Sequence, residues 1–145
     1  MFTHILIATD GSELAAKAVT QGLDLAKGMA ARVTAVNVSE PWVAVAPSEV
    51  AMAFPMKEYE ESVAANAARI LAAVAGDAEA RGVQCTTLHV KDQFPAEGII
   101  ETAQKQGCDL IVMASHGRRG LMRILLGSNA TKVLTHSTIP VLVCR

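Results

Sequence analysis

The stretch of sequence that decides the fold lies near the start of the chain and reads His4-Ile5-Leu6-Ile7-Ala8-Thr9-Asp10-Gly11-Ser12. The apolar run from Ile5 to Ala8 is too short for the hydrophobic region of a signal peptide and is typical of a strand buried on both faces. The polar residues after it suit the start of a helix, and Ser12 is a candidate N-cap for a helix that begins near Glu13. A buried strand followed directly by a helix predicts the first unit of a parallel α/β sheet.

Strand and helix alternate in the same way along the rest of the chain. Dense β-branched and aliphatic residues predict five strands, at residues 4–9, 33–38, 84–90, 109–114 and 139–144. Apolar residues at helical spacing predict about four helices between them, over residues 14–29, 63–78, 95–107 and 128–136. We therefore expect an α/β fold with right-handed crossovers and a mostly parallel sheet. Pro140 cannot donate to a ladder, so the last strand is expected at a sheet edge.

The composition fits one domain and argues against some classes of partner. The chain has 145 residues, of which 51% are hydrophobic and 19% charged, so we expect one domain over residues 1–145. A formal net charge of -1 without blocks of like charge argues against nucleic acid and anionic membranes as partners. The three cysteines are widely spaced, and no apolar run approaches the ~18 residues of a membrane span. We expect a soluble, cytoplasmic protein with reduced thiols.

Ligands of such a sheet bind outside the carboxyl ends of its strands. The polar segments there are Thr9 to Ser12, Val38 to Glu40, Lys91 to Gln93 and Ser115 to Gly117. The last of these leads through a glycine-containing loop to Gly127 and Ser128 at the start of a predicted helix. A helix N-terminus offers unpaired N–H groups and partial positive charge, and the hydroxyl of Ser128 adds a donor, so we predict phosphate binding here.

The two glycines of this loop suggest how a phosphate chain would be held. We expect Gly117 to adopt a positive φ that turns the chain away from the strand, and Gly127 to let a ligand approach the backbone. The loop is neither a Walker A sequence nor a dinucleotide fingerprint, because both GxxxxGK[ST] and GxGxxG are absent. A receiver domain is also excluded, because Asp10 has no acidic neighbour, and flavin binding is disfavoured by the small number of aromatic residues.

The loop resembles the universal stress protein family, whose ATP-binding members carry the pattern G-x2-G-x9-G-[ST]. Gly117, nine intervening residues and Gly127-Ser128 match this pattern, while Ala114 stands at the position of the first glycine. Residues 5–12, 110–113 and 139–143 are similar to the first, fourth and closing strands of the family, so the resemblance covers nearly the whole chain. It implies a Rossmann-like, three-layer α/β/α domain with strand order 3-2-1-4-5.

The resemblance also implies roles for the residues at the strand ends. Asp10 would reach the adenosine end of a nucleotide, Val38 would contact adenine, and Met113 with Ala114 would form the floor of the pocket. The phosphates would receive donors from the loop and from the helix start. The methyl group of Ala114 would cost about 1 kcal/mol if it faced the ligand. The candidate cofactor-binding residues are Thr9, Asp10, Val38, Met113, Ala114, His116, Gly117, Arg119, Gly127, Ser128 and Asn129.

The resemblance implies a homodimeric, ATP-binding stress or regulatory protein, with Mg²⁺ accompanying the triphosphate and an unknown regulatory partner. The apolar edge of residues 139–144 would pair with its own copy. No catalytic or metal-ligating residue is assigned, and slow ATP hydrolysis is the most that we expect. Two alternatives stay open, namely a weak ATPase or nucleotidyl-transfer enzyme and a nucleotide-free dimeric scaffold.

Some of the candidate features also have a plain structural interpretation. His116 has no second ligand at metal spacing, which favours a hydrogen-bonding role. Arg119 and its neighbouring arginines either neutralise phosphate or only solvate a loop. Residues 41–56 are expected to form a long loop with an apolar content, either as a lid or partner patch or folded back onto the domain.

Overall fold

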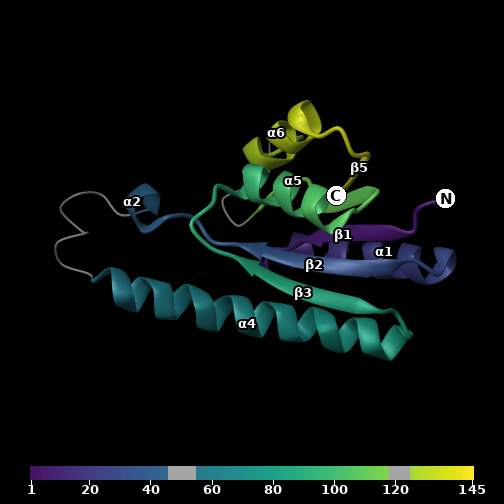
Figure 1. Ribbon diagram of the computed structural model, residues 1–145, viewed down its shortest axis with the longest axis horizontal. Coiled ribbons are helices and arrows are strands. Elements are labelled where there is room, and N and C mark those ends of the chain that lie inside the picture. Colours follow the sequence, from purple (N-terminus) through teal and green to yellow (C-terminus); the bar gives the residue numbers. More distant parts are fainter. Residues whose placement is uncertain (46–54, 118–124) are drawn as a thin grey trace.

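The computed structural model describes residues 1–45, 55–117 and 125–145. Helices and strands alternate along the chain, as Figure 1 shows. The elements are β1 (His4–Ala8), α1 (Glu13–Met29), β2 (Arg32–Val38), α2 (Trp42–Val45), α4 (Met56–Arg81), β3 (Cys85–Val90), α5 (Pro95–Gln106), β4 (Leu110–Ala114), α6 (Ser128–His136) and β5 (Val141–Cys144). The predicted alternation of strand and helix is confirmed.

The strands form one five-stranded parallel sheet in the order β3-β2-β1-β4-β5, as predicted. β1 lies at the centre, where Ile5 is paired with Val33 of β2 and with Leu110 of β4. Every residue of β1 and β4 is buried, which explains their continuously apolar sequences. The two edge strands, β3 and β5, are partly exposed. The strand order reverses between β1 and β4, so a ligand site is expected at their carboxyl ends.

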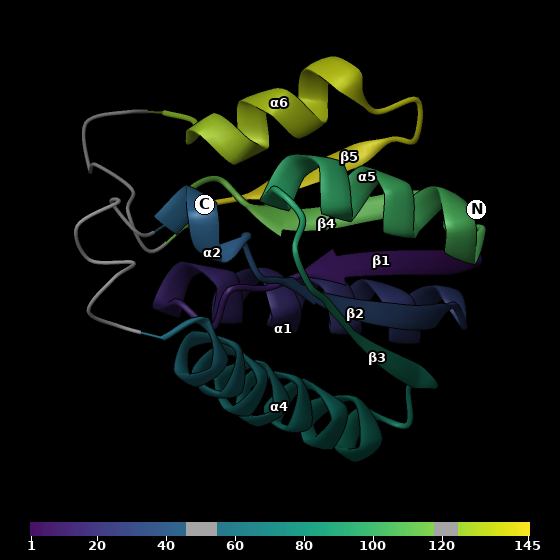
Figure 2. The same cartoon turned by 60° about the vertical axis from the view of Figure 1, so that its left-hand side comes forward.

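Helices cover both faces of the sheet (Figure 2). One apolar cluster joins α1 and α4 to residues such as Ile7 and Val33, and a second joins α5 and α6 to residues such as Leu6 and Ile111. Successive residues of a strand point to opposite faces, so Leu6 and Ile7 belong to different clusters. The result is the expected three-layer arrangement.

The ends of the helices follow local sequence signals. The hydroxyl of Ser12 accepts a hydrogen bond from the N–H of Ala15 at 3.2 Å, which confirms the predicted N-cap of α1. Pro95 occupies the first turn of α5, and Gly107 ends that helix with a φ of 68°. Gly11, with a φ of 78°, makes the turn between β1 and α1 that a residue with a side chain would rarely adopt.

Two helical boundaries differ from the prediction. Helix α4 begins at Met56, seven residues before Val63, the first residue of the predicted helix, because its first two turns are exposed and charged and so carry no apolar spacing. Residues 42–45, expected in a loop, form the short helix α2, in which the ring of Trp42 lies 4.9 Å from that of Tyr59. Residues 46–54 of the same expected loop lie outside the described residues.

The last strand lies at the edge of the sheet, as Pro140 predicted. It starts at Val141 rather than at Ile139, and the carbonyl of Pro140 accepts a hydrogen bond from the N–H of Ile111 at 2.9 Å. Pro140 therefore stands just before the first residue of the strand, a position at which a sheet tolerates proline. Within residues 1–45, 55–117 and 125–145, no helix combines the length and apolar character needed to cross a membrane.

Candidate functional site

A cavity of about 560 Å³ opens at the carboxyl ends of β1, β2 and β4. Its walls also include the first turns of α4, α5 and α6, which approach this edge from both faces of the sheet. In Figure 2 the starts of these helices lie on the same side of the sheet as the end of β4. The cavity therefore occupies the place where the strand order reverses, as expected for a ligand site of an open α/β sheet.

The structure brings the predicted site residues together. All ten that lie in the described part of the chain line this one cavity, namely Thr9, Asp10, Val38, Met113, Ala114, His116, Gly117, Gly127, Ser128 and Asn129. Arg119 lies outside the described residues. Their convergence concerns position only, and their role in binding stays a prediction.

Asp10 follows β1 and lies beside the residues that follow the neighbouring strand β4. Its Oδ1 accepts a hydrogen bond from the N–H of Ser12 at 2.9 Å, which fixes the turn after β1. A Cβ added to Gly117 would lie 2.7 Å from Asp10 Oδ2. The carboxylate thus lies directly against the backbone that follows β4. The predicted positive φ of Gly117 is wrong, because the positive-φ glycines of the described chain are Gly11, Gly82 and Gly107. The absence of a side chain at this position leaves room for the carboxylate of Asp10.

Position 127 has little room for a side chain, because the chain folds back closely on itself there. Its N–H donates to the carbonyl of Ser115 at 2.6 Å, and an added Cβ would lie 3.0 Å from the same oxygen. Its φ of −71° is open to any residue. The expected approach of a ligand stays a prediction, and the close approach seen at Gly127 is that of the backbone of residues 115 and 116. This contact sets the N-terminus of α6 beside the end of β4.

The N-terminus of α6 faces the cavity with Ser128, Asn129 and Ala130. No side chain within the described chain caps this end, whereas Ser12 caps α1. The N–H groups of a first helical turn have no partner inside their helix, and the helix dipole adds partial positive charge. Lys132, one turn further on, also lines the cavity. This end of the cavity can therefore accept an anion.

His116 directly precedes Gly117 in the chain and also lies close to Gly127, where an added Cβ would be 3.4 Å from the Cα of His116. Its Nδ1 is 3.0 Å from the hydroxyl of Ser115, and its Nε2 is buried and lacks a hydrogen-bond partner within the described residues. A buried polar atom of this kind is costly unless a partner reaches it. Among the described residues, no group of three or more His, Cys, Asp or Glu side chains could hold a metal ion.

Ala114 replaces the first glycine of the pattern without filling the cavity. It is 9% exposed and belongs to the apolar cluster beneath α1 and α4. Met113, the preceding residue, belongs to the cluster on the opposite face and also reaches the cavity. The methyl group of Ala114 is thus packed mainly against the protein.

The opposite end of the cavity lies at β2 and is mixed in character. Val38 packs closely against α5, because a Cβ at Gly98 would lie only 2.8 Å from Val38 Cγ1. The hydroxyl of Tyr59 donates to the carbonyl of Glu40 at 2.8 Å, which ties α4 to the end of β2. Burial, together with the charges of Glu40 and Asp92, raises the pKa of Tyr59, so its hydroxyl stays a donor.

Several lining residues escaped sequence reasoning because they lie on helices or, for Phe94, at the N-cap of α5. Their side chains come from the first half of α4, from α5 and from α6. They are Tyr59, Val63, Asn66, Phe94, Pro95, Ile99 and Lys132. Only the expectation that helices start at this edge of the sheet could have found them.

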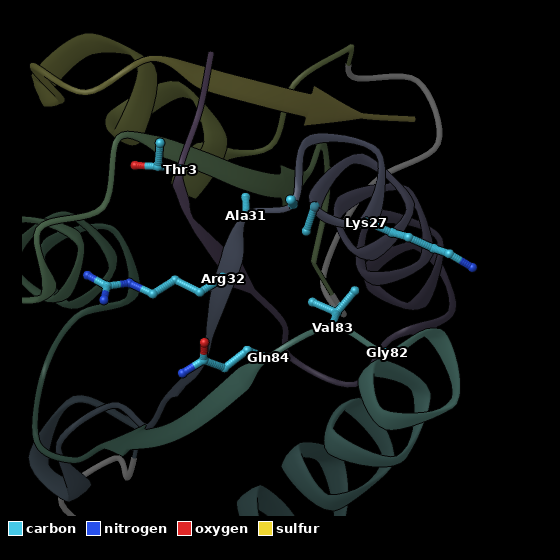
Figure 3. Close-up of a pocket in the computed structure, with 9 residues that line it drawn as sticks. Thr3, Lys27, Ala31, Arg32, Gly82, Val83 and Gln84 are labelled. Carbon is cyan, nitrogen blue, oxygen red and sulfur yellow. The ribbon is translucent and has the colours of Figure 1, made fainter.

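A second cavity, of about 650 Å³, lies at the amino ends of the strands (Figure 3). It is lined by the C-terminal ends of α1 and α4 and by residues such as Thr3, Arg32 and Gln84. The side chains of Lys27 and Arg32 extend in opposite directions there. Its charged groups therefore do not converge on a common ligand, and none of the predicted residues reaches it.

A five-stranded parallel sheet of order 3-2-1-4-5, with helices on both faces and a cavity at its switch point, defines a Rossmann-like, three-layer α/β protein. The model of the universal stress protein family matches residues 1–145. Universal stress protein YxiE of Bacillus subtilis is 33% identical over the full length of both chains. Universal stress protein MJ0531 of Methanocaldococcus jannaschii is 35% identical over 100% of this chain and 83% of its own length. The chain belongs to the universal stress protein family.

Solved structures agree with this assignment. The structure of protein MJ0577 of Methanocaldococcus jannaschii has a TM-score of 0.84 and 28% identity, with 99% of this chain and 96% of that chain covered. Two structures of the same fold contain a nucleotide. One is a universal stress protein in complex with cAMP, at 21% identity and a TM-score of 0.73. The other is from Archaeoglobus fulgidus in complex with dAMP, at 16% identity and a TM-score of 0.70.

Proposed function

We propose that this protein binds adenine nucleotides, ATP with Mg²⁺ in particular, in the cavity at the carboxyl ends of β1, β2 and β4. In this proposal it is a cytoplasmic module whose nucleotide occupancy regulates a partner or a stress-tolerance response. The observation that carries the proposal is the uncapped N-terminus of α6, which the contact of Gly127 with the backbone of Ser115 sets beside the end of β4, in the same cavity as Asp10 and Gly117. A helix end that no side chain caps is suited to a phosphate group.

The dimensions and chemistry of the cavity support a nucleotide. Its volume of about 560 Å³ falls in the range of ordinary small-molecule sites. The α6 end offers N–H groups, the hydroxyl of Ser128 and the ammonium of Lys132, whereas the β2 end offers apolar groups of Val38 and Ile99. Phosphates at α6 and a base at β2 would each meet a matching surface. The complexes of two proteins of this fold with cAMP and dAMP are consistent with this proposal.

Ala114 is compatible with this function. Because its methyl group packs into the cluster beneath α1 and α4, it would weaken nucleotide binding by no more than about tenfold. Asp10 is placed to contact the nucleotide from the end of β1, near Gly117. Mg²⁺, when present, would neutralise triphosphate charge and be held mainly by the phosphates and water. We propose a binding module rather than an enzyme with rapid turnover.

The protein is also proposed to form a homodimer through β5. This strand pairs with β4 on one side and is the outer strand of the sheet. Leu142 is 39% exposed on it, and Leu134 of α6 is 43% exposed. Such an apolar edge is a template for pairing with another strand, and a second copy is its simplest occupant.

The test combines identification of the ligand with a matched pair of glycine variants. Mass spectrometry of the purified protein is expected to detect a bound adenine nucleotide, and calorimetry with ATP and Mg²⁺ is expected to show saturable binding. Gly127→Ala should weaken ATP binding at least about tenfold, because the new Cβ pushes against the carbonyl of Ser115 and displaces the N-terminus of α6.

Gly76→Ala is the control, because a Cβ at this exposed position of α4 meets nothing within 4 Å. It should leave ATP affinity unchanged. Urea unfolding of both variants shows whether Gly127→Ala still folds cooperatively. Absence of ATP binding by the unaltered protein would contradict the proposal, and so would equal affinities of the two variants.

A further inference from the structure

Ser39 and His89 form a polar pair at the β2 end of the cavity. Ser39 follows β2 and His89 lies on the neighbouring edge strand, β3, with Ser39 Oγ and His89 Nε2 2.5 Å apart. The N–H of Ser39 donates to the carbonyl of Val90 at 2.8 Å, and its own carbonyl accepts from the N–H of Gln93 at 3.3 Å. Both backbone groups are thus used within the sheet edge. The hydroxyl is the polar group that Ser39 offers to the cavity that it lines.

The position of this pair matches the base of a nucleotide whose phosphates lie at α6. Strands β4, β1 and β2 are neighbours in the sheet, and their spacing places the end of β2 about 10 Å from that of β4. Val38 and Ile99 offer apolar contact for the faces of a ring at the same end. A base lying there would present its polar edge to the segment that contains Ser39.

The groups at this end are rich in hydrogen-bond acceptors. Burial, together with the charge of Lys91, lowers the pKa of His89, so its imidazole is neutral near pH 7 and has one bare nitrogen. With Nε2 as that nitrogen, it accepts a hydrogen bond from the Ser39 hydroxyl, and the lone pairs of Oγ remain for a ligand. Glu40 also lines the cavity, and the hydroxyl of Tyr59 already donates to the carbonyl of Glu40.

We propose that Ser39 is a specificity-determining residue that accepts a hydrogen bond from the amino group at C6 of a purine base, with His89 as the positioning residue that holds its hydroxyl. The pair selects a 6-amino purine over a 6-oxo purine. This inference rests on the proposed nucleotide function and adds to it the residues that read the base. The oxygen of a 6-oxo purine is a hydrogen-bond acceptor and would face the Ser39 hydroxyl oxygen, which is also an acceptor here. Both oxygens would then lack a donor, and an unpaired buried polar group is costly.

Inosine triphosphate is the matched probe, because it carries the same ribose and triphosphate as ATP and an oxo group at C6. Calorimetry should show that the unaltered protein binds ATP at least about tenfold more tightly than inosine triphosphate. Ser39→Ala should weaken ATP binding and bring the two affinities to within about threefold of each other. Inorganic tripolyphosphate, which reports on the α6 end alone, should bind Ser39→Ala and the unaltered protein equally.

Thr87→Ala is the control variant, since Thr87 is an exposed residue of the same strand as His89. It should keep the full preference for ATP. His89→Phe, which has no ring nitrogen, should lose the preference, whereas His89→Gln supplies an amide oxygen as acceptor and should restore much of it. Nitrogen NMR of the labelled imidazole should show Nδ1 protonated and Nε2 bare in the complex with ATP.

Three results would overturn the inference. These are equal affinities of the unaltered protein for ATP and inosine triphosphate, an unchanged preference in Ser39→Ala, and a complex in which Nε2 of His89 carries the proton. In each case ATP still binds, so the proposed function stands. Failure of both ATP and tripolyphosphate to bind the unaltered protein would overturn the proposed function and this inference together.

Discussion

At the start of β1, His4 is a buried titratable side chain away from the cavity. It is 6% exposed, its Nε2 lies 2.8 Å from the hydroxyl of Thr34, and its Nδ1 is buried without a hydrogen-bond partner in the described part of the chain. Burial, together with the charge of Arg32, lowers the pKa of His4 below the ordinary histidine value of 6.5. Protonation would bury a positive charge, so the folded state favours the neutral ring.

This pKa shift predicts a loss of stability in mild acid. Below pH 6.5 the unfolded state binds more protons than the folded state, so the free energy of unfolding falls as the pH drops from 6.5 toward the lower pKa of folded His4. One such group changes the slope by at most about 1.4 kcal/mol per pH unit. Urea unfolding at several pH values between 5 and 8 should show this loss, and His4→Gln should reduce it.

His89, whose pKa is also lowered, contributes in the same direction and leaves a residual slope in His4→Gln. The lowered pKa of Asp109 acts separately, because its stabilisation is present above about pH 4 and is lost below it. An identical slope in His4→Gln and the unaltered protein would contradict the assignment to His4.

The sequence predicted which residues line the cavity more accurately than it predicted the structural role of each residue. The sequence predicts glycine at position 117 for its backbone conformation, but the φ there is not positive, and the absence of a Cβ leaves room for the carboxylate of Asp10. The two residues are far apart in the chain, and only the pairing of β1 with β4 brings them together. A contact of this kind leaves no local signal. Strand ends, in contrast, are visible as polar residues after apolar runs, which is why Thr9, Val38 and His116 were found.

At the scale of elements, α1 owes its close packing on the sheet to Gly22. A Cβ at this position would lie 2.7 Å from Cδ1 of Ile7 and 3.4 Å from Cγ1 of Val112, and both of these side chains are fully buried. Gly28, also in α1, is exposed, and a Cβ there would meet nothing within 4 Å. In the same helix, Gly22 has no room for a larger side chain, whereas Gly28 has room for one.

Alanine substitutions at these two glycines should have opposite effects. Alanine favours helix over glycine by about 1 kcal/mol, so Gly28→Ala should raise the free energy of unfolding by up to that amount. Gly22→Ala gains the same preference but overpacks the core, which costs ~1–3 kcal/mol, so the net change should be a loss of about 1 kcal/mol. Chemical denaturation of the two variants measures the difference, and equal stabilities would contradict it.

The elements differ in how well their sequences predicted them. The central strands and α6 were predicted closely because burial or end signals mark them. The first turns of α4 were missed because residues 56–62 are mostly exposed and carry no apolar repeat. Short α2 could not be predicted from a segment rich in proline and valine, since four residues give too little periodicity.

At the scale of the whole molecule, the free edge of β5 predicts how copies assemble. If two copies pair through this strand, a charged side chain at Leu142 would be buried against its own copy. Sedimentation equilibrium should therefore show a dimer of the unaltered protein and a monomer of Leu142→Lys. Val43→Lys is the control, because Val43 lies on α2 and is 85% exposed. A monomeric unaltered protein, or a dimeric Leu142→Lys, would contradict dimerisation through β5.

The short connection between α6 and β5 links the helix that lines the cavity to the strand proposed to form the dimer contact. The hydroxyl of Ser137 donates to the carbonyl of Ile139 at 2.8 Å and accepts from the N–H of the same residue at 3.0 Å. These two hydrogen bonds hold the turn between the end of α6 and the start of β5. A rotation of α6 would therefore also move β5, so a change at the cavity would reach the outer edge of the sheet.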